Sequence, residues 1–168
     1  PPLTLHYNTG LTNRRLAEFV QAQLAEVGVK VEVAALDWPA YLKLVDAGRT
    51  QMHRMGWIAD YPDPENFLTV LFHSKNIGER GNTSRYRNPQ VDGLLERADR
   101  ATNEAARIRL YREAERLIVE DAPWIFLNYY STDLLVHPAV RNLVEQLSPM
   151  DSSPTISLVQ MRLVWLAE

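Results

Sequence analysis

The fold is decided by residues 3–35, which read LTLHYNTGLTNRRLAEFVQAQLAEVGVKVEVAA. The run from Leu3 to Tyr7 has β character and is followed by a turn cluster, which predicts a strand. Apolar residues then recur at helical spacing over residues 12–27, and Gly28 supplies the left-handed stop that ends many helices. Valines alternate with charged residues over residues 29–33 and predict a second strand.

The alternation of strands and helices continues beyond this stretch. Asp37 is a suitable N-cap for a helix that extends to Gly48, and residues 51–59 have the length and boundaries of a third strand. Successive parallel strands require crossover helices, so we expect a parallel sheet with helices on both faces, which is a three-layer α/β fold. Ligands of such sheets bind outside the carboxyl ends of the strands.

The rest of the chain has a mainly helical pattern. Asp63-Pro64 and Asn88-Pro89 each provide an N-cap followed by a first-turn proline, and Asn103 can open a further helix. The expected elements are helices through Phe72, through Ala98 and over about 104–120, a polar loop over 74–87, strands over 123–130 and 134–137, and a closing strand pair within 156–166.

The composition is that of one ordinary globular domain. The 168 residues are 46% hydrophobic and 23% charged, with a net charge of −3 and no long run of either sign, which argues against disorder and disfavours nucleic acid as a partner. No stretch approaches the roughly 18 to 20 apolar residues of a membrane-spanning helix. The absence of cysteine removes disulfide scaffolds, thiolate nucleophiles and cysteine-ligated metal sites.

Residues that could bind a ligand are densest at the end of the third expected strand and in the loop beyond it. Arg54, Trp57, Asp60 and Tyr61 lie there, and two prolines lower the entropy lost on ordering the loop. A preorganised carboxylate such as Asp60 favours a cationic partner, while Trp57 offers a flat wall for apolar groups or cation–π contact. On a regular strand, Arg54 and Trp57 point to opposite faces.

Other interpretations of this segment stay open. Asp60 and Asp63 can cap turns and the following helix, with Trp57 in the core. A metal site could draw on the acidic loop with His53 and His73, yet their spacing matches neither the zinc-peptidase helix nor the calcium loop. Serine nucleophile elbows and glycine-rich phosphate loops do not occur in the sequence, so it favours neither an enzyme nor a cofactor.

Several blocks of sequence carry a resemblance to a known family. They are LTLHYNT at residues 3–9, GWIADYPDPENF at 56–67, YRNPQVD at 86–92, LYREAE at 110–115 and EDAP at 120–123. In order and spacing they resemble the extracytoplasmic solute-binding proteins of peptide and nickel ABC importers, the oligopeptide- and dipeptide-binding type. The resemblance extends over nearly all of the chain to about residue 140.

The resemblance implies a fold, a function and a location. Family members have two lobes that close on a ligand, and this chain is similar to the second, C-terminal lobe, of the periplasmic-binding-protein type II fold. That lobe would comprise residues 1–140, with 141–168 returning toward the first lobe. The family implies capture of short peptides, delivery to an ABC permease, a monomeric full-length protein that is periplasmic or a cell-surface lipoprotein, and no enzymatic activity, metal or cofactor.

The resemblance also implies roles for individual residues. Asp60 would pair with the α-ammonium group of a bound peptide, and Trp57 would line the same cleft with Tyr61 beside it. Arg54 is similar to the position where some oligopeptide-binding members place an arginine near the carboxylate end of the ligand. These four residues are the predicted ligand-binding residues.

Three other functions stay open. A lobe of the same family could take an oligosaccharide or another solute, with Trp57 and the tyrosines stacking on sugar rings. A hydrolase could use the acidic loop from Asp60 to Glu65. The chain could also be a scaffold or docking surface alone.

Overall fold

The computed structural model describes residues 2–129, 135, 137, 139–141 and 165–166. None of the helices in these ranges is long and apolar enough to cross a lipid bilayer. In chain order the elements are β1 (Leu3–Asn8), α1 (Leu11–Glu26), β2 (Val31–Leu36), α2 (Trp38–Asp46), β3 (Met52–His53), α3 (Glu65–Phe72), the 3-10 helix η1 (Ser74–Asn76), α4 (Pro89–Arg100), α5 (Glu104–Asp121), β4 (Val140–Arg141) and β5 (Trp165–Leu166).

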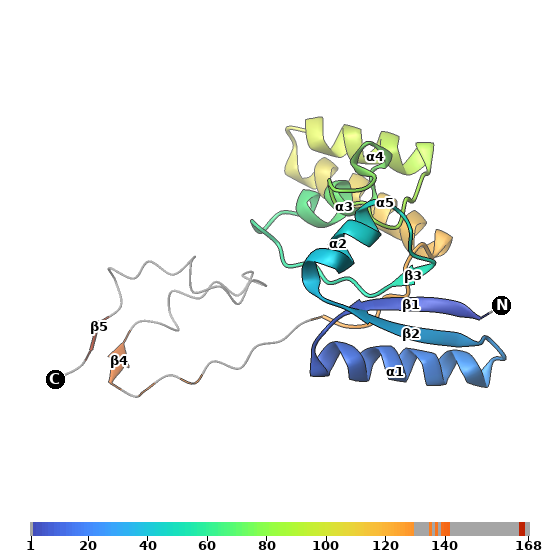
Figure 1. The fold of residues 1–168 in the computed structure, drawn as a ribbon. Coiled ribbons are helices and arrows are strands. Elements are labelled where there is room, and N and C mark those ends of the chain that lie inside the picture. The colour runs from blue at the N-terminus through green and yellow to red at the C-terminus, as the bar shows by residue number, and fades with distance from the viewer. Residues whose placement is uncertain (1, 130–134, 136, 138, 142–164, 167–168) are drawn as a thin grey trace.

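Three parallel strands form the main sheet in the order β2-β1-β3. β1 pairs with β2 along its whole length, from Leu3 opposite Val31 to Asn8 opposite Leu36. Helix α1 lies along one face of the sheet and α2 lies on the other side, as Figure 1 shows. The expected parallel sheet with a helix on each face is confirmed for this part of the chain.

One hydrophobic core lies between the sheet and α1. Leu5, Tyr7 and Val31 contribute from the strands, and Ala17 is the buried residue of α1. Leu5 and Tyr7 share a face because side chains alternate along a strand. Phe19 belongs to the apolar pattern that predicted α1 but is 58% exposed. The periodicity therefore located the helix without identifying which of its residues are buried.

The third strand is much shorter than the expected range of residues 51–59. β3 has two residues, which pair with β1, and the last bond of the ladder runs from Arg54 N–H to the carbonyl of His6 (2.9 Å). The chain then leaves the sheet, and Trp57 packs against a second core. Arg54 and Trp57 both lie beyond the end of β3, so the expectation of opposite strand faces, which assumed a regular strand, does not apply to them.

Helices α3, α4 and α5 enclose this second core and lie together in Figure 1. α4 and α5 begin where the sequence predicted, since the side chains of Asn88 and Asn103 accept hydrogen bonds from backbone N–H groups of the first turn. The apolar stripe expected on α5 is buried at Tyr111, Ala114 and Ile118. The cap and helix predictions for α4 and α5 are confirmed.

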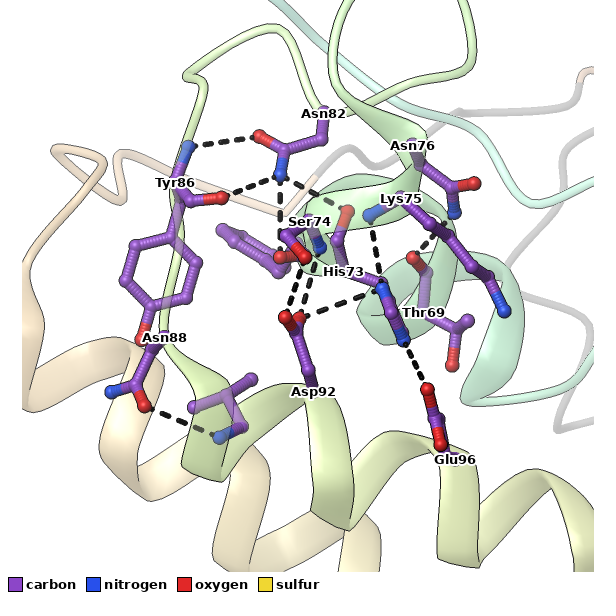
Figure 2. A network of polar contacts seen from close by, with 12 residues as sticks. Thr69, His73, Ser74, Lys75, Asn76, Asn82, Tyr86, Asn88, Asp92 and Glu96 are labelled. Atoms are coloured by element: carbon purple, nitrogen blue, oxygen red, sulfur yellow. Dashed lines mark hydrogen bonds and ion pairs between the residues drawn. The ribbon is translucent and has the colours of Figure 1, made fainter.

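Figure 2 shows the polar network that orders the loop between α3 and α4. Asn82 is fully buried, and its amide donates to the carbonyls of His73 (3.2 Å) and Tyr86 (2.9 Å). Asp92 on α4 accepts from the backbone N–H of Ser74 (2.9 Å). The segment is loop-like and polar, as expected, but it is held to both helices by its own hydrogen bonds.

The strand expected over residues 123–130 is not formed over 123–129, the part of it that is described. Trp124 packs against the second core, and Ile125 and Phe126 are 57% and 52% exposed. A strand needs a hydrogen-bonded neighbour, and no described strand pairs with this segment. β4 and β5 form a separate antiparallel pair. The other two expected strand regions, 134–137 and 156–166, lie mostly outside the described residues.

Candidate functional site

The candidate site is the loop that connects the carboxyl end of β3 to α3. Trp57 is half-buried, whereas Asp60 and Tyr61 are exposed, Tyr61 by 46%. Pro62 and Pro64 follow in this loop and fix their own φ angles, which limits the conformations of the segment. The loop thus presents a carboxylate and a phenol to solvent beside a partly covered indole.

Asn66, on the first turn of α3, holds Trp57 and Asp60 together. Its side chain is inside the protein, with the residue 2% exposed. Asn66 Oδ1 accepts from Trp57 Nε1–H (2.9 Å) and from the backbone N–H of Asp60 (3.1 Å). Asn66 Nδ2 donates to Asp60 Oδ2 over a longer distance of 3.5 Å. The indole and the carboxylate are therefore fixed by one buried side chain.

Tyr61 is anchored at the outer side of the same loop. Its hydroxyl donates to Glu65 Oε2 on the first turn of α3. This hydrogen bond to a carboxylate is the main reason that the pKa of Tyr61 is raised above its ordinary value. Tyr61 is consequently a neutral phenol with an exposed ring over the physiological pH range.

Asp63 connects the loop to helix α5. It forms a two-pronged ion pair with Arg107, with Nη1 to Oδ2 at 2.8 Å and Nη2 to Oδ1 at 2.7 Å. The hydrogen bonds from Arg107 hold the pKa of the Asp63 carboxyl below its usual range. Asp63 Oδ1 also accepts from Glu65 N–H (2.8 Å), although α3 begins at Glu65 with Pro64 as the flanking residue, one position later than expected.

The ion pair continues into the second core through Tyr111. The hydroxyl of Tyr111 donates to Asp99 Oδ1 (2.7 Å) and lies 3.0 Å from Arg107 Nη2, and Thr69 Oγ1 donates to Asp99 as well (3.1 Å). Burial, followed by the hydrogen bond to Asp99, raises the pKa of Tyr111. The loop that carries Asp60 is thereby tied to α3, α4 and α5 at once.

Arg54, the remaining predicted site residue, lines a different feature. A groove of about 260 Å³ is lined by Arg54 and His53 together with Leu16 of α1 and Leu127 of the segment after α5. Trp57, Asp60 and Tyr61 do not line it. The structure therefore brings Trp57 and Asp60 together, places Tyr61 next to them in the loop, and puts Arg54 on a separate wall.

The two histidines that are candidate metal ligands by sequence have other partners. His53 Nδ1 lies 3.1 Å from Thr50 Oγ1 and His53 Nε2 lies 3.0 Å from Thr83 Oγ1. Burial, with a smaller contribution from His6, lowers the pKa of His53. His73 belongs to the network in Figure 2. Within the described ranges, no three metal-binding side chains gather in one place.

Asn66 and Arg107 were not among the predicted site residues. Asn66 had a local signal, because an asparagine within the apolar helix sequence ENFLTVLF needs partners if it is buried. Arg107 had none, because its partner Asp63 is 44 residues away and lies on another element. Pairing across such a distance depends on how α3 and α5 pack.

The fold defines a class of structure, an α/β unit that displays a carboxylate and an indole in the loop beyond its parallel sheet. Residues 1–79 match the model of the bacterial extracellular solute-binding proteins, family 5 middle region. The chain is 34% identical over 132 residues to heme-binding protein A of Haemophilus influenzae, and 29% identical over 157 residues to the periplasmic oligopeptide-binding protein OppA of Escherichia coli. It belongs to the extracellular solute-binding proteins of family 5.

The chain spans about a quarter of the length of these relatives. The two alignments cover 79% and 92% of this chain but 24% and 28% of the relatives. The solved structure of the periplasmic binding protein DppA from Helicobacter pylori, in complex with the peptide STSA, matches with a TM-score of 0.67 and 34% identity, over 73% of this chain and 24% of that one. The expected type II periplasmic-binding-protein fold is confirmed.

Proposed function

We propose that this chain is a ligand-binding lobe of the solute-binding component of an ABC importer. The component captures short peptides outside the cytoplasm, in the periplasm or at the cell surface, and delivers them to a membrane permease. Support comes from the family match and from relatives named for oligopeptides and for di- and tripeptides. Capture and release involve no covalent step, so the proposed protein is not an enzyme and uses no cofactor.

The observation that carries the proposal is that one buried side chain, Asn66, holds both Asp60 and Trp57. An ammonium group at the amino terminus of a peptide would pair with the Asp60 carboxylate, while the indole covers the adjoining backbone. An exposed pair of this kind contributes only about 0 to 1 kcal/mol. Closure of the other lobe of the full-length protein would exclude water and strengthen the pair, provided that its other hydrogen bonds are satisfied.

We further propose residues 1–140 as the second lobe, with 141–168 leading back to a first lobe. A binding pocket encloses about 70 to 90% of a small ligand, yet Asp60 and Tyr61 are exposed. A second wall is therefore required for a closed site. In this arrangement Tyr61 contacts the ligand at the edge of the site. Arg54, in the groove that Asp60 does not line, is assigned to the carboxylate end of the ligand.

The proposal is tested in the two-lobe protein with Asp60→Asn, which removes the charge and keeps the shape. Isothermal titration with a library of tripeptides should show a loss of about 2 to 5 kcal/mol for peptides with a free amino terminus. The same library after N-acetylation should bind wild type poorly and respond little to the substitution. Glu79→Gln, which removes another exposed carboxylate, is the control and should bind as wild type does.

Other ligands give distinct outcomes in the same experiment. Equal binding of free and acetylated peptides would show that Asp60 does not recognise an ammonium group. Binding of oligosaccharides or of haemin in place of peptides would leave the fold assignment unchanged and replace the proposed ligand. Haemin is included because one relative is named for haem. Turnover of the peptides, abolished by Asp60→Asn, would favour a hydrolase.

A further inference from the structure

The contacts of Asn66 match the chemistry of a carboxamide. Its oxygen accepts from two donors, the indole N–H of Trp57 and the backbone N–H of Asp60, and its nitrogen faces the Asp60 carboxylate. A carboxylate at this position could only accept, and the hydroxyl of a serine is too short to reach both sides. The contacts therefore need both the oxygen and the nitrogen of this side chain.

We propose that Asn66 is a positioning residue, which sets the spacing between the Asp60 carboxylate and the Trp57 indole before a ligand arrives. The inference rests on the proposed function, since it assumes that these two groups receive a peptide amino terminus. It adds that the preference for a free amino group depends on a buried residue that the ligand does not touch.

The anchor of Asn66 is rigid enough for this role. Asn66 lies on the same helix as Thr69, Leu71 and Phe72, which are all buried. Its side chain is 2% exposed and cannot exchange its partners for water without local opening. Asp63 holds the start of this helix to α5. A displacement of Asn66 would therefore require a displacement of α3.

Loss of the carboxamide would leave two N–H groups without their acceptor. Trp57 Nε1–H and Asp60 N–H would have to turn toward water, because buried donors need partners. The loop would then have to be ordered again whenever a ligand binds, and ordering of side chains and loops on binding lowers affinity. Binding through the ammonium group should weaken, whereas contacts elsewhere on the ligand should not.

The experiment compares Asn66→Ala with Asn76→Ala in the two-lobe protein. Asn76 is the matched control, since its amide donates to the Thr69 carbonyl on α3 (2.8 Å) and its backbone bonds, among the described residues, run to His73 and Asn82 outside the site loop. For each variant the selectivity is the ratio of affinities for the free and the acetylated tripeptide library. Hydrogen exchange of the Trp57 indole N–H, assigned with Trp57→Phe, reports the contact itself.

Asn66→Ala should lower the selectivity about tenfold and speed the exchange of the indole N–H, while Asn76→Ala leaves both unchanged. A folded Asn66→Ala protein with wild-type selectivity would overturn the inference and leave the proposed function intact. If Asn66→Ala does not fold, Asn66→Ser decides by the same criterion. A wild-type protein without selectivity would contradict the proposed function, and the inference would fall with it.

Discussion

At the scale of single residues, the loop of the candidate site is held by a few polar side chains, each of which has more than one hydrogen-bond partner. Asp63 combines a two-pronged bond from Arg107 with acceptance from Glu65 N–H. An aspartate before a proline predicts the contact with a backbone N–H of the next few residues, here that of Glu65. It does not predict the ion pair with Arg107. The sequence therefore singles out Trp57, Asp60 and Tyr61 as candidates, but it does not reveal Asn66 and Arg107, which hold this loop.

The ion pair between Asp63 and Arg107 predicts a pH-dependent stability. Because Arg107 lowers the pKa of the Asp63 carboxyl in the folded protein, the stabilisation is fully present above the pKa of the unfolded chain, about 3.9. It is lost as pH falls through the folded pKa. Asp63→Asn should reduce the free energy of unfolding at pH 7 by about 1 to 2 kcal/mol, and the difference should narrow below about pH 4.

Urea unfolding of wild type and variant across this pH range measures the difference. Asp60→Asn is the control, since its carboxylate is exposed, and its effect on stability should be small. Arg107→Lys keeps the charge but loses the fork of two donors, so an intermediate effect is expected. A difference that does not change between pH 7 and pH 3 would show that the ion pair is not its source.

At the scale of elements, the sequence predicts the helices well but predicts the strands only in part. Asn88 and Asn103 cap their helices through side chains a few residues from the N–H groups that they accept from, so the signal is local. The runs at 51–59 and 123–130 had equally clear β character. Strands form only where a neighbouring backbone lies in register, however, and β3 leaves the ladder after His53, opposite His6, although β1 continues to Asn8.

Two glycines on different elements should respond to alanine in opposite directions. Gly93 lies within α4, and a methyl group there meets no atom within 4 Å, so Gly93→Ala should stabilise the protein by about 0.5 to 1 kcal/mol. Gly81 has φ of +125° and its new methyl group would lie 2.8 Å from the Val70 carbonyl oxygen. Gly81→Ala should therefore destabilise by about 1 to 3 kcal/mol.

Thermal and urea unfolding of the two variants provide the measurement. The pair is matched, because each adds one methyl group to a glycine and reduces the freedom of the unfolded chain equally. A stabilising Gly81→Ala would mean that the loop between α3 and α4 is not held against α3 as described. A destabilising Gly93→Ala would place an unexpected neighbour over this face of α4.

At the scale of the whole molecule, the sheet with α1 and the group of α3, α4 and α5 have separate cores. The chain passes from one to the other through the loop that carries Trp57 and Asp60. The sequence predicted the parallel sheet because strand and helix patterns alternate without ambiguity up to Asp46. The second core could not be assigned in advance, because the residues that define it come from segments as far apart as Trp57 and Ile118.

This arrangement predicts that the 168-residue chain alone binds peptides weakly. Asp60 and Tyr61 are exposed, so an ammonium group at Asp60 would keep most of its water, and an exposed ion pair contributes about 0 to 1 kcal/mol. With one wall present, the dissociation constant for a free tripeptide should be about millimolar or weaker.

The two-lobe protein should bind the same peptide at least about a hundredfold more tightly, because closure buries the pair and excludes water. Titration of the isotope-labelled chain, followed at the Asp60 N–H and Trp57 indole N–H signals, measures the weak constant directly. Micromolar binding by the chain alone would mean that this wall is a complete site, and that the first lobe serves release or docking instead of affinity.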